Sequence, residues 1–183
     1  MGGDTVAVSR ARARDEVGLR GHLRLQVVDE HGQVVDERAG DNVITTVGYS
    51  ILAAAMAWSG VQDQAANLGI TSPTYLTPLF GAVGSGAGVP AKSDLALFSE
   101  LGRQTVGGPA ASPATPSVAA EAAWLFYFPN PSVTWTVTEA GLFAQATSTA
   151  GSGILVDHWA FSPSVSVPTS NSLILQVSLA LGP

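Results

Sequence analysis

A glycine-rich segment at residues 79–103 has the residue types of a phosphate-binding loop. Four glycines, Gly81, Gly84, Gly86 and Gly88, precede a lysine. A P-loop needs that lysine directly after a glycine and directly before a serine or threonine, so that backbone N–H groups and the ammonium converge on one anion. Here Lys92 follows Ala91, and Pro90 has no N–H to donate. The dinucleotide fingerprint also fails, because Val89 stands where its third glycine belongs. The segment therefore predicts a turn between two apolar segments and no cofactor site.

The histidines do not have the spacing of a metal site. His22, His31 and His158 are far apart, and the chain has neither an HExxH nor a His-x-His motif. Asp157 is adjacent to His158, but neighbouring strand residues point to opposite faces, which argues against one shared ion. The chain has no cysteine, so thiolate ligands and disulfides are excluded. We predict no bound metal.

Catalytic chemistry has candidate residues but no motif to organise them. Glu100, Glu139 or Asp157 could serve as a general acid, yet nothing places two of them at the separation that such chemistry needs. Asp157, His158 and a serine could form a triad, but the sequence has no GxSxG elbow. We favour polar residues on the rim of a strand over a triad. We therefore predict that the protein is not an enzyme and has no small-molecule substrate. A hydrolase with an unrecognised site is the alternative.

Several aromatic residues are close together in the second half of the chain. Trp124, Phe126, Phe128 and Trp135 could form a shelf for stacking sugar rings, which makes a glycan-binding module a further alternative. The first three alternate with Leu125 and Tyr127, which is also the pattern of a strand that faces a core. We favour core or subunit interface, and an exposed Trp124 would instead favour glycan binding.

Charges are few and unevenly placed. Hydrophobic residues make up 46% of the 183 residues and charged residues only 12%, and so few charges in a soluble protein favour contacts between subunits. The first residues, 1–16, predict a basic arm in which Arg10, Arg12 and Arg14 dock onto a partner. The arm has no aromatic residue to stack on bases, which argues against nucleic acid. The longest apolar run is too short to span a membrane.

The elements that follow the arm predict one β-rich domain over residues 17–183. Alternating apolar and polar residues predict a hairpin over 20–28 and 33–38, and four later runs read as consecutive antiparallel strands. Helix-favouring residues with helical spacing predict one short helix over 46–58. Loops are predicted over residues 61–78 and 104–119. The expected fold is an antiparallel β-sandwich or a partly open barrel, with an extended N-terminal arm.

The order of several short motifs resembles that of small bacteriophage virion proteins. The motifs are the glycine-rich segment, "SDLALFSELGR" (93–103), an aromatic strand ending in Pro-Asn, "VTEAGLFAQ" (137–145) and "ILVDHWAF" (154–161). They are most similar to the N-terminal attachment domains of tail-collar and tail-fibre proteins, in which a GxG segment precedes an acid and arginine pair. The resemblance singles out a structural motif of Arg103, Glu139, Gly141 and Phe143. At a strand bend, Glu139 is expected to accept backbone N–H bonds or to pair with Arg103, which follows a helical turn.

The resemblance implies a structural subunit of a phage particle, made in the host cytoplasm and located in the virion. Its expected partners are other virion structural proteins and copies of itself, with a trimer favoured. The printed chain carries no long fibre extension, and the basic arm is not part of the family pattern. The expected position is therefore the tail tip, the baseplate or a fibre adaptor, as a minor tail protein. A capsid decoration protein on the head is the alternative.

Overall fold

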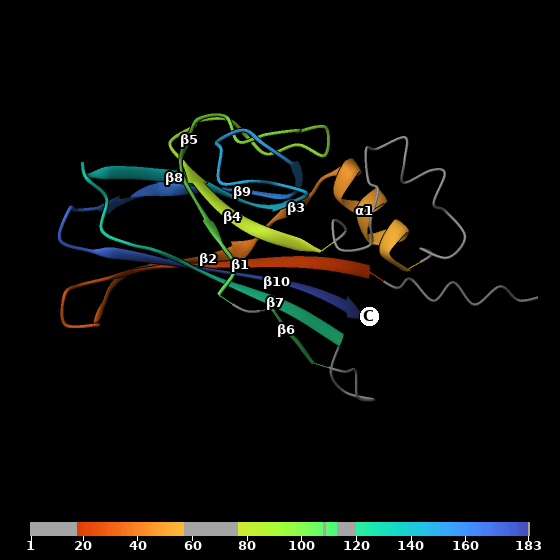
Figure 1. The fold of residues 1–183 in the computed structure, drawn as a ribbon, viewed down its shortest axis with the longest axis horizontal. Helices are drawn as coiled ribbons and strands as arrows, with labels where there is room; N and C mark the ends of the chain where they lie inside the picture. The colour runs from red at the N-terminus through yellow and green to blue at the C-terminus, as the bar shows by residue number, and fades with distance from the viewer. Residues whose placement is uncertain (1–17, 57–76, 108, 113–119, 183) are drawn as a thin grey trace, which may run out of the picture.

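The described strands form two stacked layers. The computed structural model describes residues 18–56, 77–107, 109–112 and 120–182. In this part of the chain, ten strands pair into two five-stranded antiparallel sheets, with one helix beside them (Figure 1). The chain is thus mainly β, as expected, and of the two expected architectures it has the sandwich.

Sheet A joins the two ends of the described chain. Its strands lie in the order β2 (Val34–Asp41), β1 (Gly18–Val28), β10 (Ser172–Gly182), β7 (Ala120–Phe128) and β6 (Pro109–Ser112). β1 and β10 pair along their whole length, from Gly18 opposite Gly182 to Val28 opposite Ser172. β1 and β2 form the predicted hairpin. Along β1, Leu23 and Leu25 are buried and Arg24 between them is exposed, which is the alternation that predicted the strand.

Sheet B carries the strands that position the candidate site. Its order is β3 (Val43–Ile44), β9 (Ile154–Val167), β8 (Trp135–Ala144), β4 (Pro78–Gly84) and β5 (Glu100–Thr105). The register of β8 and β9 shifts twice, between Val137 and Glu139 and between Leu142 and Phe143. Such irregularities bend a strand and redirect its side chains.

Three strands, β3, β5 and β6, lie where the sequence did not predict them. β5 begins at Glu100, although a helical turn was expected just before Arg103. Both β5 and β6 also enter the range 104–119, which was predicted to be a loop. Each is the outermost strand of its sheet. Because a short edge strand pairs on one side only and buries little of itself, it needs no apolar alternation, and the sequence pattern gives no signal for it.

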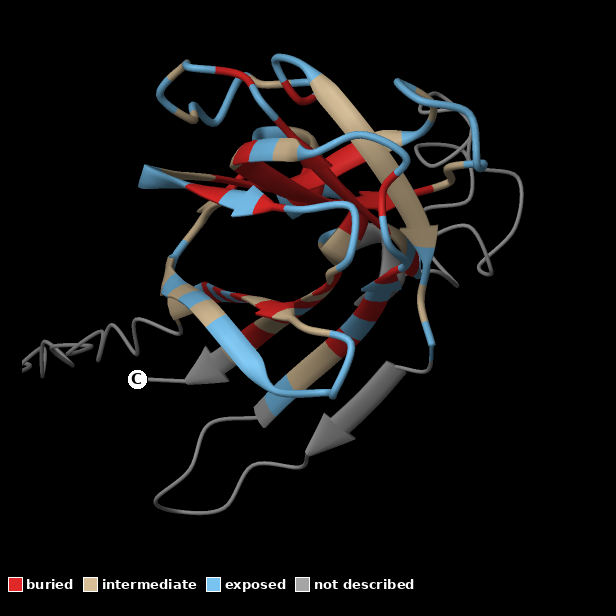
Figure 2. Ribbon diagram, turned by 90° about the vertical axis from the view of Figure 1, so that its left-hand side faces the viewer, coloured by how far each residue is buried: buried red, intermediate tan, exposed pale blue. Residues whose placement is uncertain are grey.

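The space between the sheets is filled by apolar side chains of both. Buried residues gather on the facing sides of the two layers (Figure 2). Trp124, Phe126 and Phe128 of β7 all lie in this core, with Trp135 packed partly buried against it. The predicted core role of these aromatics is confirmed, and they form no exposed shelf.

One helix, α1 (Thr46–Met56), packs against β9. Thr45 precedes it, and its Oγ1 accepts a hydrogen bond from the Gly48 N–H at 2.9 Å, which caps the first turn. The same hydroxyl donates to the Leu155 carbonyl at 2.6 Å and so ties the cap to the sheet. The helix begins where predicted, and residues 57 and 58 of the predicted range lie outside the described residues. No helix in the described part is long and apolar enough to cross a membrane.

The segment 85–99 covers part of the outer face of sheet B. Its two ends meet, since the Ser85 N–H donates to the Ser99 carbonyl at 2.8 Å. Leu97 from this segment packs with Ala82, Phe143 and Leu155 in a second apolar cluster. We call residues 85–99 the covering loop. The covering loop therefore shields polar side chains of sheet B from solvent.

Candidate functional site

Glu139 of β8 is the centre of the contacts between the covering loop and sheet B. Its side chain is completely buried. Oε1 accepts from the N–H groups of Gly86 and Ser99, both at 2.8 Å, and Oε2 accepts from the Phe98 N–H at 2.9 Å. Of the two roles expected for Glu139, the structure has the acceptor of backbone N–H groups. One carboxylate thus fastens both ends of the loop.

His158 of β9 lies beside Glu139 and is also completely buried. Its Nε2 is 3.0 Å from Glu139 Oε2, and its Nδ1 is 2.7 Å from Asp94 Oδ2 in the covering loop. The Phe98 ring lies against the imidazole, with 4.9 Å between ring centroids. The expectation that Asp157 and His158 are polar residues on a strand rim is wrong, because both are buried. The covering loop shields His158, and loop coverage leaves no periodic signal in the sequence.

Arg103 pairs with Glu100 and not with Glu139. Its Nε and Nη2 donate to the two Glu100 carboxylate oxygens, each at 2.8 Å, in the two-bond geometry that guanidinium and carboxylate favour. Nη1 donates to the Ser152 carbonyl at 2.7 Å, and the guanidinium carbon lies 4.3 Å from the Phe143 ring centroid. The expected pairing with Glu139 is therefore corrected. The ion pair instead connects β5 to the turn before β9.

The glycines of the segment are explained by close packing rather than by a phosphate. A Cβ built on Gly86 would lie 2.3 Å from the Phe98 Cβ and 2.5 Å from Glu139 Oε1. On Gly141 of β8, it would lie 2.7 Å from a methyl group of Leu155. A side chain at Gly86 would push the covering loop away from the sheet, and one at Gly141 would displace Leu155. Lys92, the residue that suggested an anion site, lies 5.9 Å from the centre of the Tyr49 ring.

A second buried acid faces the other way. Asp157 accepts from the Asn42 side-chain amide, and its second oxygen, Oδ1, has no partner among the described residues. Burial raises the pKa of the Asp157 carboxyl well above its ordinary value, and bonds from the His158 backbone N–H and the Asn42 amide offset this only in part. Asp157 pairs across the sheet with Leu142, whereas His158 pairs with Gly141. The two neighbours thus point to opposite faces, as predicted.

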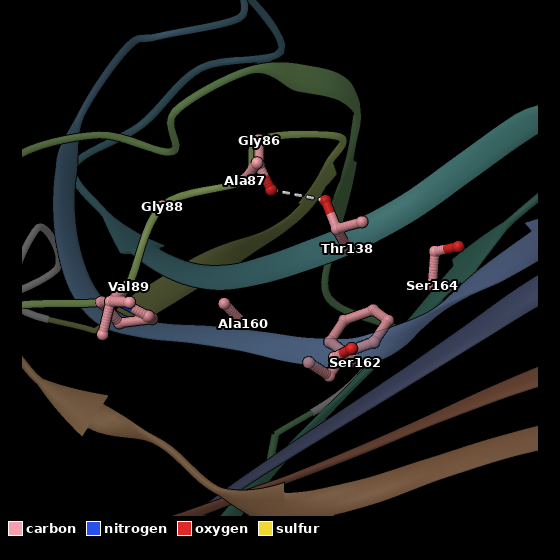
Figure 3. A pocket seen from close by; sticks show the side chains of 10 residues that line it. Gly86, Ala87, Gly88, Val89, Thr138, Ala160, Ser162 and Ser164 are labelled. Carbon is pink, nitrogen blue, oxygen red and sulfur yellow. Dashed lines mark hydrogen bonds between the residues drawn. The ribbon is translucent and has the colours of Figure 1, made fainter.

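A shallow depression lies next to the covering loop (Figure 3). It measures about 510 Å³ and is lined by residues 86–90 of the covering loop and by residues of β8 and β9. Thr138 borders it and donates its hydroxyl proton to the Gly86 carbonyl at 2.6 Å, and Ser162 and Ser164 add hydroxyls. None of its lining residues is acidic, basic or a histidine. Asp94, His158 and Glu139 do not border it.

The geometry gives the buried acids and histidine a positioning role. Among the described residues, no serine or threonine hydroxyl contacts His158, so the triad that the sequence allowed has no nucleophile there. The described residues contain no group of three histidines or acids able to hold a metal ion. His22 and His31 are exposed next to Asp41 and Glu30. Arg10, Arg12 and Arg14, the predicted docking arm, lie outside the described residues.

Two partners of these buried side chains, Asp94 and Asn42, were not expected from the sequence. Asp94 lies 64 positions before His158 and Asn42 lies 115 positions before Asp157. Their contacts depend on where the covering loop and β3 are placed, which no local pattern encodes.

No family model, no curated protein and no solved structure matches the chain.

Proposed function

We propose that the chain is a non-enzymatic structural subunit of a bacteriophage particle, positioned at the tail tip, the baseplate or a fibre adaptor. The observation that carries this proposal is the convergence of the motifs that resemble phage attachment domains. The GxG segment at 84–86, the Glu100 and Arg103 pair and the "EAGLFA" segment at 139–144 are distant in sequence, yet all three are joined in sheet B or the covering loop. They therefore act as one structural unit.

The chemistry of this unit supports a structural role. Glu139 has its oxygens occupied by three backbone N–H groups, and Arg103 has its donors occupied by Glu100 and a backbone carbonyl. These groups stabilise the position of a loop and a turn. The neighbouring depression offers no acid or base for a reaction.

Exposed apolar side chains support association with other subunits. Val89, Leu95 and Phe98 of the covering loop are exposed, as are Leu125 and Tyr127 on the outer face of β7. Burial of such side chains is the main source of stability in lasting protein interfaces. We expect light scattering of the purified chain to give a mass near three times the 18.7 kDa of one copy.

The test is immunogold labelling of intact virions with an antibody to this chain, combined with an immunoblot of purified particles. Label at the tail tip or collar is the expected result, and label spread over the head would assign the chain to capsid decoration instead. Antibody absorbed with the purified chain is the control. Absence of the chain from purified particles would refute the proposal of a virion subunit.

A further inference from the structure

His158 has a carboxylate at each of its two ring nitrogens, and the proposed function does not use this arrangement. The distances are 2.7 Å from Nδ1 to Asp94 and 3.0 Å from Nε2 to Glu139. The imidazole is completely buried and the Asp94 side chain is 14% exposed. Which of these two contacts is a hydrogen bond depends on how many protons the ring carries.

If Glu139 is ionised, its bond to His158 requires a proton on Nε2. Both Glu139 oxygens already accept backbone N–H groups, so the carboxylate acts as an acceptor towards the loop on each side. An ionised carboxylate has no proton to give. With Glu139 in this ionised form, Nε2–H is the donor of the 3.0 Å contact.

If Asp94 is ionised as well, its bond to His158 requires a proton on Nδ1. Asp94 Oδ2 accepts from the Ala91 N–H at 2.8 Å, and the same oxygen faces Nδ1. A neutral imidazole carries one N–H and one lone pair, so it can serve only one of the two carboxylates. Both contacts are satisfied together when the ring is imidazolium.

We propose that Asp94, His158 and Glu139 form a buried pH-sensitive latch that holds the middle of the covering loop on sheet B while the imidazole carries both ring protons. When the pH rises, one proton leaves the ring for solvent, and a nitrogen lone pair then faces a carboxylate oxygen. That contact is repulsive, and Asp94 is the partner that can turn to water, because it is on the loop and partly exposed. This inference does not depend on the proposed virion role.

No other described charge replaces the imidazolium. Asp157, next to His158, is bonded to Asn42 on the opposite face. Lys92 of the covering loop lies over the Tyr49 ring, and Arg103 is bonded to Glu100. The protonated ring is thus the cation that balances two acids under the loop, and its loss leaves them uncompensated.

Opening should be confined to the middle of the loop. The ends remain attached through the three N–H bonds to Glu139, which do not need the histidine. The middle is held by Asp94 and by the Lys92 carbonyl, which accepts from the Thr46 N–H at 2.7 Å at the start of α1. The exposed side chains of Val89 and Leu95 lie on the same loop. The latch would therefore change the position of an apolar surface without unfolding the sandwich.

The test is an NMR titration of the histidine rings in the full ¹⁵N-labelled chain, between about pH 6 and about pH 9. His158 is assigned by its proximity to the Phe98 ring, and the exposed His22 and His31 serve as internal references. At neutral pH we expect both His158 nitrogens to be protonated. When the ring loses a proton, hydrogen-exchange protection of the Ala91 and Asp94 amides should fall about tenfold, while that of Ser99 stays constant.

Asp94→Asn keeps the shape of the acid and removes its charge, so it should lower the pH at which His158 loses its proton. Asp41→Asn is the matched control, since Asp41 lies 3.5 Å from an exposed histidine ring, and it should leave the His158 transition unchanged. A His158 ring with one proton at neutral pH would overturn the proposal. So would a transition that Asp94→Asn does not move, or loop protection that stays constant through the titration.

Discussion

The completely buried Glu139 is the residue on which the loop contacts depend most. We predict that Glu139→Gln destabilises the protein, because the amide of glutamine brings N–H donors to a place where three backbone N–H groups need acceptors. Each donor left without an acceptor costs about 1–3 kcal/mol. The measurement is the free energy of unfolding in urea. Glu121→Gln, at an exposed position of β7, is the control. An unchanged urea midpoint for Glu139→Gln would show that the carboxylate does not serve these donors.

Asp157 gives a prediction for pH dependence. Burial raises its pKa in the folded state, so the folded protein holds this proton at pH values where the unfolded chain has lost it. The contribution of Asp157 to stability therefore declines as the pH rises from about 3.8, its ordinary value, towards the folded value. Asp157→Asn keeps an acceptor for Asn42 without a charge. We expect this variant to exceed the wild type in stability at pH 7 and to approach it near pH 4.

The comparison is made by thermal unfolding of both proteins across this pH range. Asp41→Asn removes an almost fully exposed carboxylate and should show no such trend. If the difference between Asp157→Asn and the wild type is independent of pH, Asp157 does not carry its proton into the folded state as inferred.

At the scale of elements, the sequence predicted the longer strands and missed three short strands at the edges of the sheets. Leu23 and Leu25 on β1, and Leu173 and Leu175 on β10, are buried as their spacing indicated. β3, β5 and β6 were missed because such short edge strands need only one pairing partner. The site was predicted in part: the role of Glu139 as an N–H acceptor followed from its position at a strand bend. Its partners did not, since the path of the covering loop depends on packing between distant segments.

The contact between α1 and β9 yields a prediction against helix propensity. Alanine normally favours a helix over glycine by up to about 1 kcal/mol. A Cβ at Gly48, however, would lie 2.1 Å from the Val156 carbonyl oxygen of β9. Gly48→Ala should therefore lower the melting temperature, because the helix must move away from the sheet. Ala53→Gly, at an exposed position of the same helix, is the control and should lower the melting temperature through helix propensity alone. A Gly48→Ala protein with a higher melting temperature than the wild type would contradict the close approach of helix and sheet.

At the scale of the whole molecule, the last strand completes the first sheet. β10 lies between β1 and β7, so sheet A cannot form until residues 172–182 have joined residues 18–28. The sequence indicated consecutive antiparallel strands but not this order, because alternation identifies a strand without identifying its neighbours. The arrangement also places the start of β1, where the predicted arm attaches, next to the end of β10 (Figure 1).

Deletion of residues 1–16 separates folding from assembly. β1 begins at Gly18 and its pairing with β10 starts there, so the truncated chain should keep the melting temperature of the full chain. If the arm docks through its arginines, the truncated chain should enter particles less efficiently, measured by immunoblot of virions produced under complementation. A full-length chain with Arg10, Arg12 and Arg14 all changed to serine tests whether charge or length matters. Because salt screens the attraction between exposed charges, an arm that binds by charge should also release from particles more readily at high salt. Normal incorporation of the truncated chain would rule out anchoring by the arm.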